Sequence, residues 1–165
     1  MTFTIPDGLH SDLYPLAWLV GTWDGRGSAA YPGEEPVDFG QQITFAADDR
    51  PFLSYSARSW VLDAEGEVVR PLHVEYGFWR ADGEGAISVV LAQPNGQAEV
   101  WVGDIATAKI EIATDAVVRT KTAEDPYTAG HRLYGLVDSQ LLWAFDKATD
   151  SQPMSSFAWA RLERQ

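Results

Sequence analysis

The sequence predicts an all-β protein, a single antiparallel up-and-down β-barrel with a short N-terminal helical turn. Three observations lead to this prediction. Short segments of alternating apolar and polar residues recur at the spacing of about eight to twelve residues that is typical of antiparallel sheets. Aromatic residues make up 12% of the chain, with seven Trp, and wide rings pack well on pleated surfaces. Nearly every connection is short, which suits a closed meander better than the crossovers of a sandwich.

Length and composition indicate one domain with one core. The chain has 165 residues, of which 45% are hydrophobic and 22% charged. Such a chain can bury one core and is too short to divide into two. The expected domain therefore spans residues 1–165. The sequence has no cysteine, which excludes disulfides, thiolate metal ligands and a cysteine nucleophile.

Charge narrows the class of partner. The formal net charge of −12 opposes binding to nucleic acid and to anionic membranes, because both interactions depend on clustered Lys and Arg. We interpret the excess acid as a solubility feature. The first residues have no basic segment followed by a long apolar stretch, and no apolar run is long enough to span a bilayer. The expected location is the cytoplasm.

The first expected element is a short helix from about His10 to Leu19. Ser11 or Asp12 can cap its first turn, and Gly21 ends it. Three leucines would share one face of this helix: Leu13, Leu16 and Leu19.

About ten or eleven strands are expected after the helix. They cover residues 20–30, 37–47, 52–62, 68–80, 86–93, 97–105, 109–114, 117–122, 131–137, 140–146 and 155–164. Turn or loop residues separate them at 31–33, 48–51, 63–66, 94–96, 123–129 and 138–139. Several strands carry polar residues on both faces, as around Glu75. A barrel interior tolerates this pattern because it can hold a ligand or water as well as side chains.

The first strand carries a GxWxGxG motif formed by Gly21, Trp23, Gly25 and Gly27. We expect the indole to plug one end of the barrel and the glycines to lie where strands approach closely. The motif is not a phosphate-binding loop, because it begins a strand and no Gly-Lys-Ser/Thr follows it.

More specific motifs follow in order along the chain. They are Pro51-Phe52-Leu53-Ser54-Tyr55, His73-x-Glu75-x-Gly77-Phe78-x-Arg80, Leu91-Ala92-Gln93-Pro94-x-Gly96, Glu99-Val100-x-Val102-Gly103 and Gln152-Pro153-Met154-x-x-Phe157. Together with the first motif, they resemble the nitrobindin family over nearly the whole chain. The resemblance implies a ten-stranded antiparallel barrel, similar in shape to fatty-acid-binding proteins and lipocalins. It also implies a cavity for b-type haem, whose iron the family keeps largely ferric. The haem proteins of the family bind nitric oxide and isomerise peroxynitrite to nitrate.

The last strand departs from the family pattern at one decisive position. The family motif there resembles (Asn/Gln)-Pro-Leu-x-x-His-Leu-x-Ala-x-Leu, and its histidine is the proximal haem ligand. The segment from Gln152 to Leu162 matches the anchors without a gap, but Phe157 stands at the histidine position. Phenylalanine has no lone pair and cannot ligate iron.

The resemblance places four further residues beside the cavity: Leu72, His73, Gln93 and Lys147. Lys147 stands at a family position that is usually Met. We expect its ammonium to reach the barrel rim, and the alternative is that it meets the head group of an anionic ligand. His73 is the one histidine with a family reason to face the cavity, where we expect a structural hydrogen bond, for example to Glu75.

The remaining polar residues are expected to be structural. We expect His10 to be exposed and His131 to start a strand at the rim. No His, Asp and Glu set has the spacing of a metal site, and no Ser/His/Asp triad is present. The pairs Glu34-Glu35 and Asp48-Asp49 are interpreted as solvated turns.

Three functional hypotheses remain. The first is a binding protein, a divergent nitrobindin without haem-iron ligation or an enzymatic activity, whose cavity binds a small hydrophobic or amphipathic ligand. The second is a haem b-binding peroxynitrite isomerase or nitric oxide-binding protein that uses His73 or neutral Lys147 as a substitute ligand. The third is a scaffold filled by its own aromatic side chains, which predicts no pocket of ligand size. The sequence identifies neither the natural ligand nor the oligomeric state.

Overall fold

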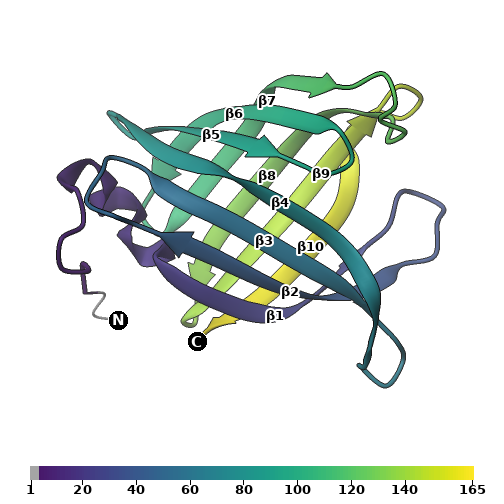
Figure 1. Cartoon of the computed structure of the whole chain (residues 1–165), viewed down its shortest axis with the longest axis horizontal. Helices are drawn as coiled ribbons and strands as arrows, with labels where there is room; N and C mark the ends of the chain where they lie inside the picture. The colour runs from purple at the N-terminus through teal and green to yellow at the C-terminus, as the bar shows by residue number, and fades with distance from the viewer. Residues whose placement is uncertain (1–3) are drawn as a thin grey trace.

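The structure is a computed structural model, and it describes residues 4–165. Within these residues, ten strands form one closed antiparallel barrel (Figure 1). Strands that follow one another along the chain are neighbours in the sheet, and β10 pairs with β1 to close it. The predicted all-β, up-and-down barrel is confirmed. No helix in the described part of the chain is long and apolar enough to cross a membrane.

The strand bounds follow the sequence pattern closely. They are β1 (Gly21–Ala29), β2 (Val37–Ala46), β3 (Leu53–Leu62), β4 (Val68–Gly83), β5 (Ala86–Ala92), β6 (Gln97–Ala106), β7 (Lys109–Arg119), β8 (Tyr127–Val137), β9 (Gln140–Thr149) and β10 (Ser155–Arg164). The two strands expected at 109–114 and 117–122 are one strand, β7. Asp115 is the extra residue of a bulge opposite β6, so the strand continues through it. The expected loop at 123–129 is shorter, because β8 begins at Tyr127.

A short helix, η1 (Ser11–Leu19), closes one end of the barrel. It is a 3₁₀ helix with Pro15 inside, and proline has no N–H for an α-helical hydrogen bond. Its cap is His10 rather than Ser11 or Asp12, since the His10 ring accepts the Asp12 N–H at 3.2 Å. The three predicted leucines are all buried: Leu13, Leu16 and Leu19.

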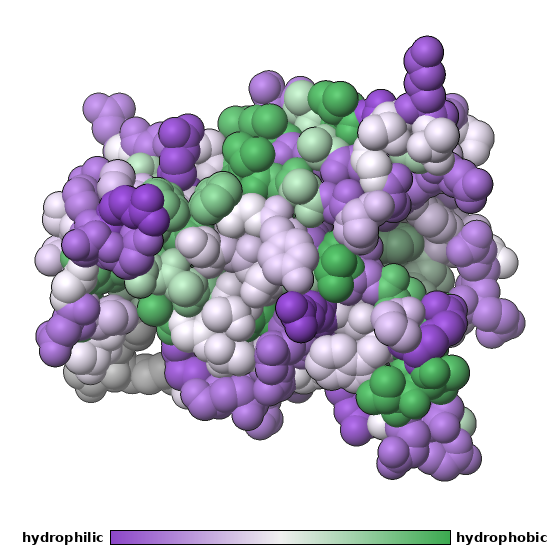
Figure 2. Space-filling model, in the orientation of Figure 1, coloured by the Kyte–Doolittle hydropathy of each residue, from purple (hydrophilic) through white to green (hydrophobic). Residues whose placement is uncertain are grey.

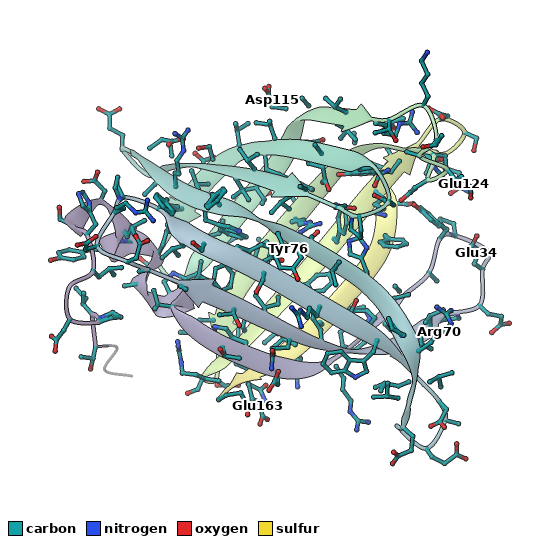
Figure 3. All side chains as sticks on the ribbon, viewed as in Figure 1. Glu34, Arg70, Tyr76, Asp115, Glu124 and Glu163 are labelled. Carbon is teal, nitrogen blue, oxygen red and sulfur yellow. The ribbon has the colours of Figure 1, made fainter. Side chains whose placement is uncertain are left out.

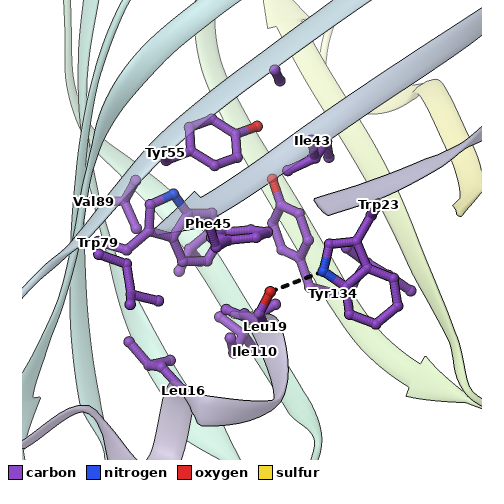
Figure 4. Packing of buried hydrophobic residues seen from close by; sticks show 14 of the residues in the cluster. Leu16, Leu19, Trp23, Ile43, Phe45, Tyr55, Trp79, Val89, Ile110 and Tyr134 are labelled. Atoms are coloured by element: carbon purple, nitrogen blue, oxygen red, sulfur yellow. Dashed lines mark hydrogen bonds between the residues drawn. The ribbon is translucent and has the colours of Figure 1, made fainter. Parts of the chain in front are cut away.

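Trp23 joins the helix to the barrel core. Its indole Nε1 donates a 2.8 Å hydrogen bond to the carbonyl of Leu19 (Figure 4). Deeper in the core, the Trp79 ring meets Phe45 and Tyr134 edge-on, each with ring centroids 5.1 Å apart. This aromatic packing fills the end of the barrel that the helix covers, as predicted for the tryptophan of the first motif.

The glycines of β1 allow the strand to lie close to β10. A Cβ atom on Gly25 would collide with the carbonyl oxygen of Arg161, and one on Gly27 with that of Trp159. Both clashes are with backbone, which cannot move aside without shifting a strand. The close approach expected from the sequence is therefore present at both glycines.

The surface drawn in Figure 2 is mostly polar, with a group of apolar residues over β5 and β6. Val90 on β5 and Val102 on β6 are exposed.

Candidate functional site

A cavity of about 370 Å³ opens at the barrel end opposite η1. Binding pockets for small ligands are typically on the order of 300–1,000 Å³. The β1–β2 loop and the β7–β8 loop lie at this end, where Figure 3 shows Glu34 and Glu124. The hypothesis of a scaffold filled by its own aromatic side chains predicted no pocket of ligand size, and this cavity contradicts that prediction.

All five residues predicted to surround the cavity lie on its wall: Leu72, His73, Gln93, Lys147 and Phe157. Lys147 and Phe157 meet, with the lysine Nζ 4.1 Å from the centre of the phenyl ring. His73 and Gln93 both approach Glu75 Oε2, at 3.8 and 3.5 Å. The four residues of the first motif lie elsewhere, on β1, and none of them lines this cavity.

Two β-bulges bring adjacent residues onto the cavity wall together. In β10, the pairing with β9 shifts between Ser156 and Ala158, so that Phe157 and Ala158 both line the cavity. In β4, the pairing with β3 skips Leu72, and both Leu72 and His73 line the cavity. Regular alternation would place one residue of each pair outside.

Lys147 lies inside the cavity wall, which corrects the expectation that it reaches the rim. Its side chain is 11% exposed, and Nζ lies 3.5 Å from Asp125 Oδ2 and 3.4 Å from the Tyr31 hydroxyl. The rings of Phe157 and Tyr127 lie 4.1 and 4.9 Å from Nζ. Burial lowers the pKa of Lys147 below its ordinary value, and the nearby Asp125 carboxylate opposes this only in part.

An ion pair that the sequence did not reveal lies deeper in the cavity. Arg132 on β8 donates to both carboxylate oxygens of Glu75 on β4, at 2.7 and 3.1 Å. The guanidinium also lies 4.3 Å from the Phe145 ring centre, and Tyr55 donates to Glu75 at 2.7 Å. Burial alone would raise the pKa of Glu75, but the charge of Arg132 and the interactions with Arg132 and His73 together outweigh burial and hold that pKa well below the ordinary value. The inward alternation of Arg132 and Tyr134 along β8 was the available signal.

A second buried carboxylate, Glu99, completes the polar interior. It accepts hydrogen bonds from Tyr127, at 2.9 Å, and from Gln93. Burial raises the pKa of Glu99 above its ordinary value, although the charge of Arg132 acts in the opposite direction. The carboxyl group is therefore easier to protonate than an exposed glutamate.

The other two histidines take no part in the cavity. His10 is half-exposed at the start of η1. His131 lies inside β8, rather than at its start or at the rim, and its Nε2 is 2.9 Å from Glu111 Oε1 on the neighbouring strand. Its neighbour Arg132 takes the inward position, so alternation turns His131 outward. Among residues 4–165, no group of three His, Cys, Asp or Glu side chains is arranged to hold a metal ion.

The charges on the cavity wall leave the mouth acidic. Four carboxylates line the cavity, Glu34, Glu35, Glu75 and Asp125, against the two cations Arg132 and Lys147. Each cation already lies beside a carboxylate of the protein, Arg132 at Glu75 and Lys147 at Asp125. An anionic ligand would have to displace Asp125 and pass the remaining acidic groups.

A closed barrel with a helix across one end and a polar-and-aromatic cavity at the other is the architecture of a small-molecule-binding β-barrel. Residues 12–164 match the family described as the THAP4-like, heme-binding beta-barrel domain. The chain belongs to this nitrobindin family.

Individual relatives agree with this assignment. A protein of Nocardioides named peroxynitrite isomerase is 48% identical over 165 residues and is covered completely, as is this chain. A protein of Cutibacterium acnes named ferric nitrobindin-like protein is 45% identical, with 99% of each chain covered. The crystal structure of Rv2717c from M. tuberculosis has a TM-score of 0.84 and 31% identity, and the match covers 95% of this chain and 99% of that one.

The family is named for haem, but the residues of this cavity do not fit a haem held from β10. Phe157 faces the cavity at the expected ligand position with a ring that has no lone pair. Beside it, burial and Asp125 raise the pKa of Tyr31, so its hydroxyl keeps its proton. Lys147 is engaged by Asp125. Within residues 4–165, His73 on β4 is the one imidazole on the wall, so β9 and β10 offer no histidine to iron.

Proposed function

We propose that this chain is a nitrobindin-family binding protein that has lost haem-iron ligation and binds a small apolar or amphipathic organic molecule in its cavity. One observation carries the proposal. At the position where the resemblance predicts the family's ligand, the Phe157 ring packs against the Lys147 ammonium at 4.1 Å and the Tyr31 ring at 4.7 Å. At this position the Phe157 ring binds the Lys147 ammonium through its face and offers no lone pair to a metal.

The cavity wall supports an organic ligand with both apolar and polar parts. One side is lined by aromatic and aliphatic groups that include Phe39, Trp143 and Phe157. The other side presents His73 and Gln93 around the Glu75 carboxylate. Apolar walls supply affinity, and a few polar groups fix the orientation of a ligand.

A haem titration followed at the Soret band tests the loss of ligation. We expect no saturable band from the natural sequence. The variant Phe157→His, combined with Lys147→Met to remove the buried cation beside the new imidazole, should give a saturable one-to-one complex. Phe157→Leu with Lys147→Met is the matched control, because it changes the same two positions without adding a donor.

A saturable histidine-type Soret band from the natural sequence would contradict the proposal. If His73→Ala then abolished that band, the competing hypothesis of a haem protein with a substitute ligand would replace it. The observation that would favour this second function is the position of His73 on the cavity wall, with its side chain 40% exposed.

Binding of the neutral fluorescent dye Nile red tests the organic-ligand half of the proposal. We expect saturable binding that Ala29→Trp prevents, because Ala29 lines the cavity. Ala92→Trp is the control, since it adds the same ring at an exposed position on β5. Equal Nile red binding by both variants would mean that the dye binds outside the cavity.

A further inference from the structure

We infer that Lys147 is a reactive amine that captures small apolar aldehydes as a reversible imine inside the cavity. This inference rests on the proposed function, because it requires that organic molecules enter the cavity, and it names their chemical class. A buried lysine on an apolar wall is the arrangement that imine-forming proteins use.

The position of Lys147 separates it from the other two lysines of the chain. The sequence has three lysines, Lys109, Lys121 and Lys147. Lys109 is 54% exposed beside Glu111, and Lys121 is exposed after the end of β7. Only Lys147 lines the cavity, with 11% of its side chain exposed. An apolar molecule concentrated in the cavity therefore meets one of the three lysine amines.

Burial makes the neutral amine, which is the form that attacks a carbonyl, easier to reach at Lys147 than at an exposed lysine. Four rings surround Nζ: Phe157, Tyr127, Phe145 and Tyr31, with centroids at 4.1, 4.9, 5.3 and 5.5 Å. This apolar cage replaces the water that would solvate an ammonium, and burial lowers the pKa of Lys147 accordingly. The same rings would contact the chain or ring of an aldehyde once its carbonyl reached Nζ.

Two groups next to Nζ can move the protons that imine formation requires. Asp125 Oδ2 lies 3.5 Å away and can accept the proton of the ammonium. The Tyr31 hydroxyl lies 3.4 Å from Nζ and donates to Asp125 Oδ1 at 3.1 Å, so the two form a short relay. Burial and the Asp125 charge keep Tyr31 protonated by raising its pKa, which makes its hydroxyl a proton donor.

The reaction is balanced without an oxidant or a reductant. The Nζ lone pair forms a bond to the carbonyl carbon, and the carbonyl π electrons move to oxygen. Transfer of a proton from nitrogen to that oxygen gives a carbinolamine. The nitrogen lone pair then forms the C=N bond while the hydroxyl group takes a proton from the Asp125–Tyr31 relay and leaves as water, and the N–H proton of the resulting iminium returns to the relay. One aldehyde and one amine give one imine and one water, and added water reverses the reaction.

The charges at the mouth favour a neutral carbonyl compound over a carboxylic acid. Glu34 and Glu35 line the cavity without a cation of their own among the lining residues, whereas Asp125 already accompanies Lys147. A carboxylate entering the cavity would meet these acidic groups and compete with Asp125 for the ammonium. An aldehyde carries no charge and leaves the Asp125 contact intact until the amine reacts.

The test compares the three lysines within one folded protein. The protein is incubated with p-dimethylaminobenzaldehyde, the imine is reduced with borohydride, and the modified lysines are quantified by peptide mass spectrometry. We expect Lys147 to be modified at least about ten-fold more than Lys109 or Lys121 at limiting aldehyde, with saturation. Lys147→Arg should abolish the saturable modification, and the control Lys109→Arg should leave it unchanged.

Equal modification of the three lysines, or none at Lys147, would overturn the inference. Because the comparison is internal to the natural sequence, it does not depend on the folding of any variant. Nile red binding measured on the same sample separates the two proposals. If the dye binds in the cavity and Lys147 is not modified, the aldehyde inference alone fails. If the dye does not bind either, the proposed function fails with it.

Discussion

The Arg132–Glu75 ion pair carries the largest expected energetic consequence of any single contact in the barrel interior. Both side chains are almost completely buried, at 7% and 6% exposure, and two hydrogen bonds of 2.7 and 3.1 Å join them. The variant Arg132→Met keeps an unbranched apolar side chain in place of the aliphatic part of arginine and removes the guanidinium with its charge. Glu75 would then be a buried carboxylate whose charge has lost its main partner.

Removing one partner of such a pair typically costs about 3–5 kcal/mol of unfolding free energy, since the other charge is left uncompensated. We expect Arg132→Met to fall in this range. Glu75→Gln should cost a similar amount, because it leaves the guanidinium unpaired. The double variant should recover most of the loss, since it leaves neither charge in the interior. Urea unfolding of the four proteins gives the interaction energy of the pair.

The pH dependence supplies an independent check of the sign. The folded-state pKa of Glu75 lies below its ordinary value of 4.5, so the pair stabilises fully above that pH and is lost as pH falls through the folded pKa. In Arg132→Met, burial without the arginine charge should raise the pKa of Glu75. The destabilisation of Arg132→Met should therefore be larger near pH 7 than near pH 4. A cost below about 1 kcal/mol at neutral pH, or no recovery in the double variant, would refute the reasoning.

Two further predictions concern the barrel wall and its second buried acid. Gly27→Ala should destabilise the barrel by about 3 kcal/mol or more, because its Cβ would collide with the Trp159 carbonyl; urea unfolding measures this against Ser28→Ala on the same strand, and near-equal stability would contradict it. Glu99 has a raised folded-state pKa, so the folded protein holds this proton more tightly than the unfolded chain and stability falls as pH rises above the ordinary glutamate range. The variant Glu99→Gln should flatten that fall in unfolding experiments between about pH 4.5 and pH 7; an unchanged pH slope would count against it.

Local patterns in the sequence were enough to predict the barrel. Alternation of apolar and polar residues located the strands, and turn residues located the connections, because both signals act over a few neighbouring residues. The helix at 11–19 was predictable for the same reason. Its cap was not, since a histidine ring at His10 accepts the hydrogen bond that Ser11 or Asp12 was expected to accept.

The interior of the site was harder to predict, because its contacts join residues that are distant in the sequence. Arg132 and Glu75 are separated by 57 positions, and neither residue alone identifies the other. Tyr127 was assigned to a loop, but a register shift near the start of β8 allows it to face inward with Arg132. Bulges of this kind reverse the alternation on which the sequence-based prediction depends.

Phe157 and Lys147, at the two positions where the sequence was expected to depart from the family pattern, form one contact in the structure. A buried ammonium is costly by itself, and Asp125 at 3.5 Å offsets only part of that cost. The face of the Phe157 ring, 4.1 Å from Nζ, supplies further stabilisation of about 1–2 kcal/mol for a desolvated cation. A protonated imidazole at the same place would be repelled by the Lys147 ammonium. If the imidazole were neutral, the ammonium would repel a metal cation bound to it. Phe157 and Lys147 therefore stabilise each other at this end of the cavity, in an arrangement that a histidine at position 157 would disrupt.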